Sequence, residues 1–206
     1  VQLLALQPRR RLAREQIVDA LWPQLAPDAG AANLRKAVHH ARQALGRHDA
    51  LAAEARELLL WPGRPVAVDA ETFEQRADAA LRARDPAVCA EVAAGYGGEL
   101  LPGACYEGWT EASRERLRAR CIELLRVSAQ WERLVRLDPC DEPAYRALMQ
   151  RELEAGNRAA ALRWYALLRE ALQQTLGIAP DARSEALRER CTAGLPVTAP
   201  AFVGRA

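Results

Sequence analysis

Apolar residues recur at helical spacing along most of this chain, and the clearest case lies near the N-terminus. The segment from residue 11 to 22 carries apolar residues on one helical face, namely Leu12, Ile17, Val18, Leu21 and Trp22. A second segment, 31–45, has a narrow apolar stripe formed by Leu34, Val38, Ala41 and Leu45. Between them, Pro27-Asp28-Ala29-Gly30 predicts a turn. The pattern therefore predicts two amphipathic helices, about 14–22 and 31–45, with Gly46 closing the second.

The face of the second helix opposite this stripe is polar and basic. It carries Arg35, Lys36, His39, His40, Arg42 and Gln43. A helix–turn–helix with a cationic outer face on its second helix fits the major groove of DNA. The histidines are mostly neutral near pH 7 and would supply hydrogen bonds more than charge. An ordinary solvated face is the alternative, and Arg42 is also placed to pair with an acidic side chain instead of DNA.

Short elements flank this helix pair on both sides. A brief helix is expected at about 2–6, ended by Pro8 and the run Arg9-Arg10-Arg11. After Gly46, two short strands are expected, one around Leu51 and one at 58–61, with a polar turn at 54–57 between them. Such a hairpin after a helix–turn–helix predicts a wing.

The remainder of the chain is predicted to be helical. Asp69 is a candidate N-cap for a helix at 71–84, and Asp85-Pro86 is a second helix-start signal. The other expected helices are 86–96, 107–127, 130–137, 142–155, 158–176 and 181–191.

The pair of helices at 142–176 fits a tetratricopeptide-like repeat. Gly156-Asn157 makes the tight turn, Ala161 is small where helices approach closely, and Tyr165 packs as a large side chain. We expect Trp109, Trp131 and Trp164 in the core. Stacked pairs of this kind leave a groove for another protein. A plain helical spacer is the alternative.

Positive charge is concentrated in the first third of the chain. Residues 1–66 hold ten Arg/Lys against six Asp/Glu, whereas the rest holds nineteen against twenty-one. All three histidines also lie in the basic part. This asymmetry indicates a polyanionic partner for the first third only.

Several function classes find no support in the residues. Lys36 is the only lysine and no glycine-rich loop precedes it, which excludes a nucleotide-binding P-loop. The five cysteines (Cys89, Cys105, Cys121, Cys140 and Cys191) are scattered and form no C-x-x-C pair. The adjacent His39 and His40 point about 100° apart on a helix, so they do not share an ion. No catalytic motif and no membrane-length apolar run is present. We therefore expect no enzymatic activity, metal or cofactor, and a cytoplasmic location with reduced thiols.

The same segments resemble a known family. LRKAVHHARQALG resembles the recognition helix of the winged-helix domain in bacterial transcriptional activators of the antibiotic-regulator (SARP) type, and REQIVDALWP resembles the helix before it. Downstream, VDAETFEQRADAAL and AGNRAAALRWYALLREALQQTLGIAPDA resemble the bacterial transcriptional activator domain of the same proteins. The two matches together cover nearly the whole chain.

The resemblance implies a mainly α fold, in which a truncated winged helix–turn–helix is followed by a tetratricopeptide-like helical domain. The implied domains are 1–66, 67–193, and a linker at 194–206. The last of these includes Phe202-Val203-Gly204-Arg205, which resembles the opening of an ATPase domain. The family places a small sheet before the first helix. We therefore expect apolar side chains such as Leu3, Leu4 and Leu6 to be exposed here and DNA binding to be weakened.

The resemblance also implies roles for single residues. The second helix would enter the major groove and the wing the neighbouring minor groove. Phosphate contacts would fall to Arg14 and the Arg9–Arg11 cluster, including Arg11, and to Arg56 or Arg64 on the wing.

The implied function is that of a bacterial transcriptional activator. Its partners would be double-stranded DNA, RNA polymerase and a second copy of the chain, with no membrane contact. Two other functions compete, a scaffold module without DNA binding and the sensor arm of a STAND-like ATPase. Salt-dependent binding to duplex DNA separates the activator from the scaffold.

Overall fold

The computed structural model describes residues 1–104 and 106–193, and it divides into two compact units. The first is Val1–Leu124 and the second begins at Leu125. Cys105 and the expected linker with its Phe202-Val203-Gly204-Arg205 motif lie outside the described residues. The domain boundary expected after residue 66 stays a prediction.

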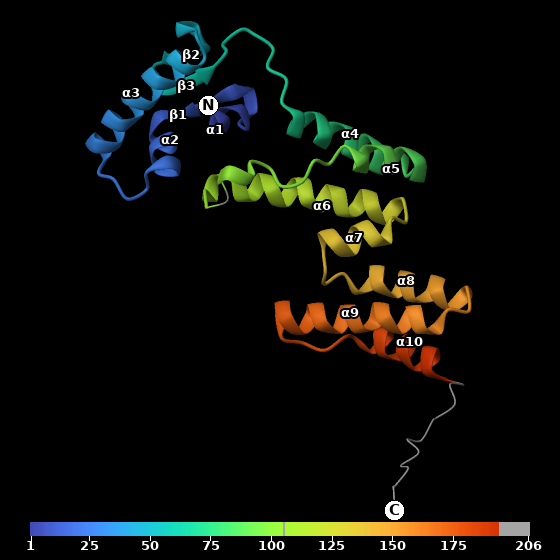
Figure 1. Cartoon of the computed structure of the whole chain (residues 1–206). Helices are drawn as coiled ribbons and strands as arrows, with labels where there is room; N and C mark the ends of the chain where they lie inside the picture. The colour runs from blue at the N-terminus through green and yellow to red at the C-terminus, as the bar shows by residue number, and fades with distance from the viewer. Residues whose placement is uncertain (105, 194–206) are drawn as a thin grey trace, which may run out of the picture. The chain divides into compact units, whose positions relative to one another are not determined.

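The first unit opens with a winged helix (Figure 1). Its elements are α1 (Gln2–Ala5), η1 (Pro8–Arg10), β1 (Arg11–Ala13), α2 (Arg14–Leu21), α3 (Pro27–Ala44), η2 (His48–Ala50), β2 (Leu51–Glu54) and β3 (Glu57–Leu60). The strands form an antiparallel sheet in the order β1-β3-β2. Leucines on one face of this sheet close a core with the helices, formed by Leu3, Leu4, Ile17, Leu34, Leu51, Leu58 and Leu60.

Two expectations for this region were wrong. Pro27 begins α3 and does not belong to a turn, because proline is favoured at the first helical position, where its missing N–H is not needed. Leu3 and Leu4 are 6% and 5% exposed and pack in the core, whereas we expected them to be exposed. The strand β1 was missed, since three residues are too few to show an alternating pattern.

The rest of the first unit is helical. It contains α4 (Asp69–Ala83), α5 (Pro86–Ala94), the short turns η3 (Pro102–Ala104) and η4 (Gly108–Thr110), and most of α6 (Glu111–Val127). The helix start at Asp85-Pro86 is confirmed, because the Asp85 carboxylate accepts hydrogen bonds from the N–H groups of Ala87 at 2.8 Å and Val88 at 3.2 Å. Asp69 is not an N-cap, since α4 begins at this residue and Val68 precedes it.

The second unit contains α7 (Trp131–Leu137), α8 (Glu142–Glu154), α9 (Arg158–Leu176) and α10 (Ala182–Thr192). Helices α8, α9 and α10 lie side by side (Figure 1). Met149, Ala161, Tyr165, Leu187 and Cys191 form the core between them. Ala161 is fully buried and Gly156 has φ +77°, as the repeat pattern predicted. The predicted fold class, a winged helix followed by helical repeats, is confirmed.

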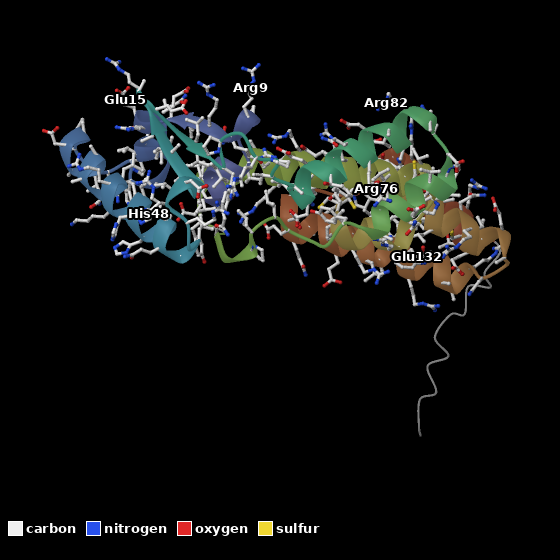
Figure 2. The ribbon with its side chains drawn as sticks, turned by 90° about the horizontal axis from the view of Figure 1, so that it is seen from above. Arg9, Glu15, His48, Arg76, Arg82 and Glu132 are labelled. Carbon is white, nitrogen blue, oxygen red and sulfur yellow. The ribbon has the colours of Figure 1, made fainter. Side chains whose placement is uncertain are left out.

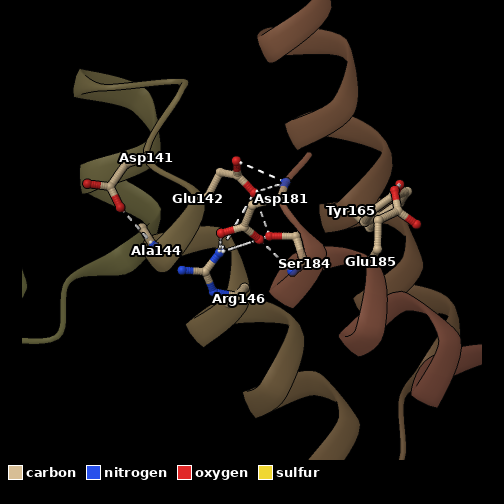
Figure 3. Close-up of polar contacts among 8 residues, drawn as sticks. All are labelled: Asp141, Glu142, Ala144, Arg146, Tyr165, Asp181, Ser184 and Glu185. Carbon is tan, nitrogen blue, oxygen red and sulfur yellow. Dashed lines mark hydrogen bonds and ion pairs between the residues drawn. The ribbon is translucent and has the colours of Figure 1, made fainter. Parts of the chain in front are cut away.

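A polar cluster ties the start of α10 to α8 (Figure 3). The Glu142 carboxylate accepts hydrogen bonds from the backbone N–H of Asp181 at 2.9 Å and from Ser184 Oγ at 2.6 Å. Arg146 Nη1 donates to Asp181 Oδ2 at 2.9 Å and to Ser184 Oγ at 3.0 Å. Ser184 is fully buried, so these bonds satisfy a hydroxyl that would otherwise be costly to bury.

Within the described part of the chain, no helix has the length and apolar character needed to cross a membrane.

Candidate nucleic-acid interface

The two helices α2 and α3 form a helix–turn–helix with a close contact at Gly30. A Cβ atom added at this glycine would lie 2.3 Å from Val18 Cγ1, so only glycine permits the observed approach. Leu34 is buried in the core cluster, and Val38 and Ala41 pack against the same cluster. The apolar stripe therefore holds α3 against the domain and turns its opposite face outward.

That opposite face is polar and open. Five of its six predicted side chains are exposed, namely Arg35, Lys36, His39, His40 and Gln43. Positions 35, 36, 39, 40 and 43 share one side of a helix. The rings of His39 and His40 are 5.6 Å apart in an edge-on arrangement. No hydrogen bond or ion pair with another described residue holds any of these five side chains, so their polar groups are available to a ligand.

Arg42 differs from its neighbours on α3. Its guanidinium donates to the carbonyl oxygen of Leu51, from Nε at 2.9 Å and from Nη2 at 2.5 Å. Leu51 is the first residue of β2, so the bond links the end of α3 to the first strand of the wing. The expected acidic partner is replaced by a backbone carbonyl, and two of the N–H groups of Arg42 are already used.

The wing is short, and its tip lies beside the start of α2. Only Ala55 and Arg56 separate β2 from β3, and Ala55 adopts a left-handed backbone with φ +47°. The backbone N–H of Arg14 donates to the carbonyl oxygen of Arg56 at 2.8 Å. Both arginine side chains are exposed and no described residue pairs with them. The structure therefore brings together two residues predicted separately as phosphate contacts.

The other two predicted arginines are engaged in ion pairs. Arg11 pairs with Glu57 across strands β1 and β3, with Nε 2.9 Å from Glu57 Oε2. Arg64 lies 3.2 Å from the carboxylate of Asp49 and over the ring of Trp61.

Arg47, which the sequence did not single out, joins this second cluster. It pairs with Asp49 at 2.9 Å and also lies over the Trp61 ring. The hydrogen bond from Arg47 lowers the pKa of Asp49. These pairs are exposed, and exposed ion pairs contribute little to stability, so replacing the carboxylate partner by another anion costs little.

The partner of one predicted residue, Arg10, escaped the sequence analysis. Arg10 belongs to the arginine run expected to hold phosphate, but its guanidinium binds Glu71 at the start of α4. No local signal predicts this, because the two residues are 61 positions apart. Arg10 is therefore removed from the phosphate cluster, which leaves Arg9 and Arg11. The DNA-contact roles of the other residues stay predictions.

The described residues hold no group of three His, Cys, Asp or Glu side chains suited to a metal ion. The described cysteines, Cys89, Cys121, Cys140 and Cys191, are free thiols, and burial raises the pKa of Cys89 and of Cys191.

Comparison with known proteins agrees with this architecture. Residues 68–191 match the model of the bacterial transcriptional activator domain. A solved structure of Mycobacterium tuberculosis EmbR in complex with a low-affinity phosphopeptide is similar in fold, with a TM-score of 0.62 and 19% sequence identity. The similarity covers 95% of this chain and 58% of that one, so the chain spans little more than half of that protein. No curated protein matches.

Proposed function

Because the chain belongs to the family of the bacterial transcriptional activator domain, we propose that it is a DNA-binding transcriptional activator whose helix α3 reads the major groove. The observation that carries this proposal is the outer face of α3. Five exposed polar side chains lie on it with no hydrogen bond or ion pair to another described residue, while the opposite stripe is packed into the core. Such a helix presents hydrogen-bonding groups to base edges at no cost in lost internal contacts.

We assign base reading to Arg35, Lys36, His39, His40 and Gln43. Arginine and lysine recognise guanine, and glutamine recognises adenine, through paired donors and acceptors in the major groove. Arg42 has two N–H groups bound to Leu51, so its main role is to position α3. Any direct contact from Arg42 to DNA would use its remaining N–H groups.

Phosphate contacts fall to the corner formed by Arg14 and Arg56. The 2.8 Å backbone bond between these residues holds the wing tip against the start of α2. Arg11 and Arg64 are secondary candidates, because each would exchange a carboxylate partner for a phosphate. Phosphate contacts fix the register of the protein on DNA and carry no sequence information themselves.

The helical repeats α7–α10 then make contact with another protein, RNA polymerase or a second copy of the chain. The family is in general non-enzymatic, and we assign no catalysis to this segment. We also place the protein in the cytoplasm, where its DNA target lies.

The test is binding of the chain to duplex DNA at several salt concentrations. Replacing Arg35 by alanine is expected to weaken binding to the preferred sequence by about 1–3 kcal/mol and to reduce discrimination among bases. Replacing Arg14 by alanine is expected to weaken binding to all sequences alike and to reduce the salt slope by about 0.9.

Arg82→Ala is the matched control. Arg82 lies on α4, is exposed, extends away from the ribbon (Figure 2) and has no described partner. The variant loses the same charge far from α3 in sequence and is expected to bind almost as well as the original chain. Equal affinity of the Arg35 and Arg82 variants for the preferred sequence would refute the assignment of α3. No salt-dependent binding in any variant would favour the scaffold function.

A further inference from the structure

The side chain of Arg10 forms a two-point ion pair with Glu71. Its Nη1 and Nη2 donate to the two carboxylate oxygens of Glu71, each at 2.5 Å. Only 15% of the Arg10 side chain is exposed, against 36% for Glu71. Two parallel hydrogen bonds of this kind add geometric specificity to the attraction between the charges.

The other donors of Arg10 also point inward. Nη1 donates to the carbonyl oxygen of Gln7 at 3.2 Å, and Nη2 donates to that of Val66 at 3.3 Å. Nε is buried and has no hydrogen-bond partner in the described structure. Arg9 behaves differently, since its side chain is exposed and extends away from the ribbon (Figure 2). The two adjacent arginines therefore point in opposite directions: Arg10 toward the interior and Arg9 toward solvent.

The backbone around Arg10 requires such an anchor. Arg9 and Arg10 have φ of +57° and +58°, in the left-handed region that non-glycine residues rarely occupy. Strained conformations of this kind persist only when surrounding contacts hold them. The next residues form β1, which leads directly to Arg14 and its bond to the wing tip. Arg10 thus holds the turn that precedes β1, and through β1 it positions Arg14 beside the wing tip.

A second contact connects the winged helix to another later element of the first unit. Trp109, on η4, packs against the leucine core of the winged helix. The ion pair and the tryptophan contact both connect elements after residue 66 to the winged helix. Two contacts at separate points restrict both the rotation and the separation of the winged helix relative to these later elements of the first unit.

We propose that Arg10 and Glu71 are a positioning pair, which holds the winged helix against α4 within the first unit and so keeps the DNA-contact residues Arg14 and Arg56 in place. This inference rests on the proposed DNA-binding function. The pair is electrically neutral and Arg10 is turned inward, so it acts on DNA binding through Arg14, Arg56 and the rest of the interface.

The experiment compares Arg10→Gln, Glu71→Gln, the double variant of these two, and the exchanged pair Arg10→Glu with Glu71→Arg, all in the full chain. Glu91→Gln is the matched control. Glu91 pairs with Arg76 on the surface of the same unit at 2.8 Å, and its loss changes the net charge by the same amount.

The first readout is duplex DNA affinity against salt. A positioning pair predicts that both single variants bind roughly fivefold more weakly or worse than their charge predicts. It also predicts an unchanged salt slope, a double variant no weaker than either single one, and partial recovery in the exchanged pair. If Arg10 instead binds a phosphate, Glu71→Gln tightens binding by more than Glu91→Gln does, and Arg10→Gln lowers the slope by about 0.9. That result would overturn the proposal.

The second readout needs no DNA. Amide hydrogen exchange in β1 and in the first turn of α4 is expected to rise together in both single variants, and to stay unchanged in Glu91→Gln. Unchanged exchange in Glu71→Gln would overturn the positioning pair whatever the DNA result. If the original chain binds no DNA while exchange rises as expected, the proposed function fails and the connection between the winged helix and α4 stands.

Discussion

The guanidinium of Arg42 donates two hydrogen bonds to the carbonyl oxygen of Leu51, at 2.9 Å and 2.5 Å. The bond connects the last turn of α3 with the first residue of β2. The helix that carries the candidate base-reading residues is therefore held to the wing by one of its own arginines.

We expect Arg42→Leu to destabilise the chain by about 1.5–3 kcal/mol, because a hydrogen bond from a charged donor to a partly buried carbonyl is lost. Chemical denaturation at neutral pH measures this difference. Arg35→Leu is the matched control, since Arg35 is exposed and has no described partner, and its effect is expected to stay within about 0.5 kcal/mol. Equal stability of the two variants would show that the Leu51 bond contributes nothing.

Gly30→Ala is expected to destabilise the winged helix by about 1–3 kcal/mol through overpacking. Helix propensity alone predicts the opposite sign, because alanine is favoured over glycine inside a helix by about 1 kcal/mol. The new Cβ would lie 2.3 Å from Val18 Cγ1, so the steric contact is expected to dominate. Thermal unfolding decides between the two signs.

The control for Gly30 is Val18→Ala, which removes the clashing methyl group. The double variant Gly30→Ala with Val18→Ala is expected to be more stable than the sum of the two single effects predicts. Strict additivity would place the strain elsewhere.

Gly156→Val is expected to destabilise the helical repeats by about 1–2 kcal/mol, because Gly156 has φ +77° in the turn before α9. No atom lies within 4 Å of the added Cβ, so the cost is backbone strain and not a clash. Gly156→Asn is expected to cost less, since asparagine tolerates the left-handed region. Denaturation of both variants, beside Gly97→Val at a glycine without positive φ, measures the order. An equal cost for valine and asparagine would contradict this account.

The stability that Glu71 supplies is expected to disappear in acid. Hydrogen bonding from Arg10 lowers the pKa of Glu71 below its ordinary value of 4.5. A carboxylate with a lowered folded-state pKa contributes fully above its unfolded pKa, and the contribution falls as pH drops through the folded value. The free-energy difference between the original chain and Glu71→Gln is therefore expected to be constant near pH 7 and to shrink below about pH 4.5. A difference that stays constant down to pH 3 would contradict the lowered pKa.

Local pattern was enough to predict most of the fold. The stripe of Leu34, Val38, Ala41 and Leu45 predicted α3 and its outward face, because helical periodicity is a property of one short segment. Asp85-Pro86 predicted the start of α5 for the same reason, since capping involves only neighbouring residues. The wing hairpin and the turn at Gly156 were also predicted from neighbouring residues alone.

Where the local signal was ambiguous or too short, only the tertiary structure decided which element forms. Pro27 suits both a turn and the first position of a helix, and only the structure shows that α3 begins at this residue, with Gly30 close to Val18 of α2. The strand β1 exists because β3 pairs with it, and three residues carry no pattern of their own.

By itself, the sequence determined which face of α3 is polar, where most helices begin and that the first third is basic, because these depend on spacing and composition along the chain. Only the tertiary structure decided which arginines are engaged by partners within the chain. Arg42 finds its partner 9 residues away, Arg11 finds Glu57 at 46 residues and Arg10 finds Glu71 at 61. In sequence these three look like Arg9, Arg14 and Arg35. They differ because the fold places an acceptor beside each of these three guanidiniums, and an acceptor that is distant in sequence cannot be predicted from the neighbouring residues.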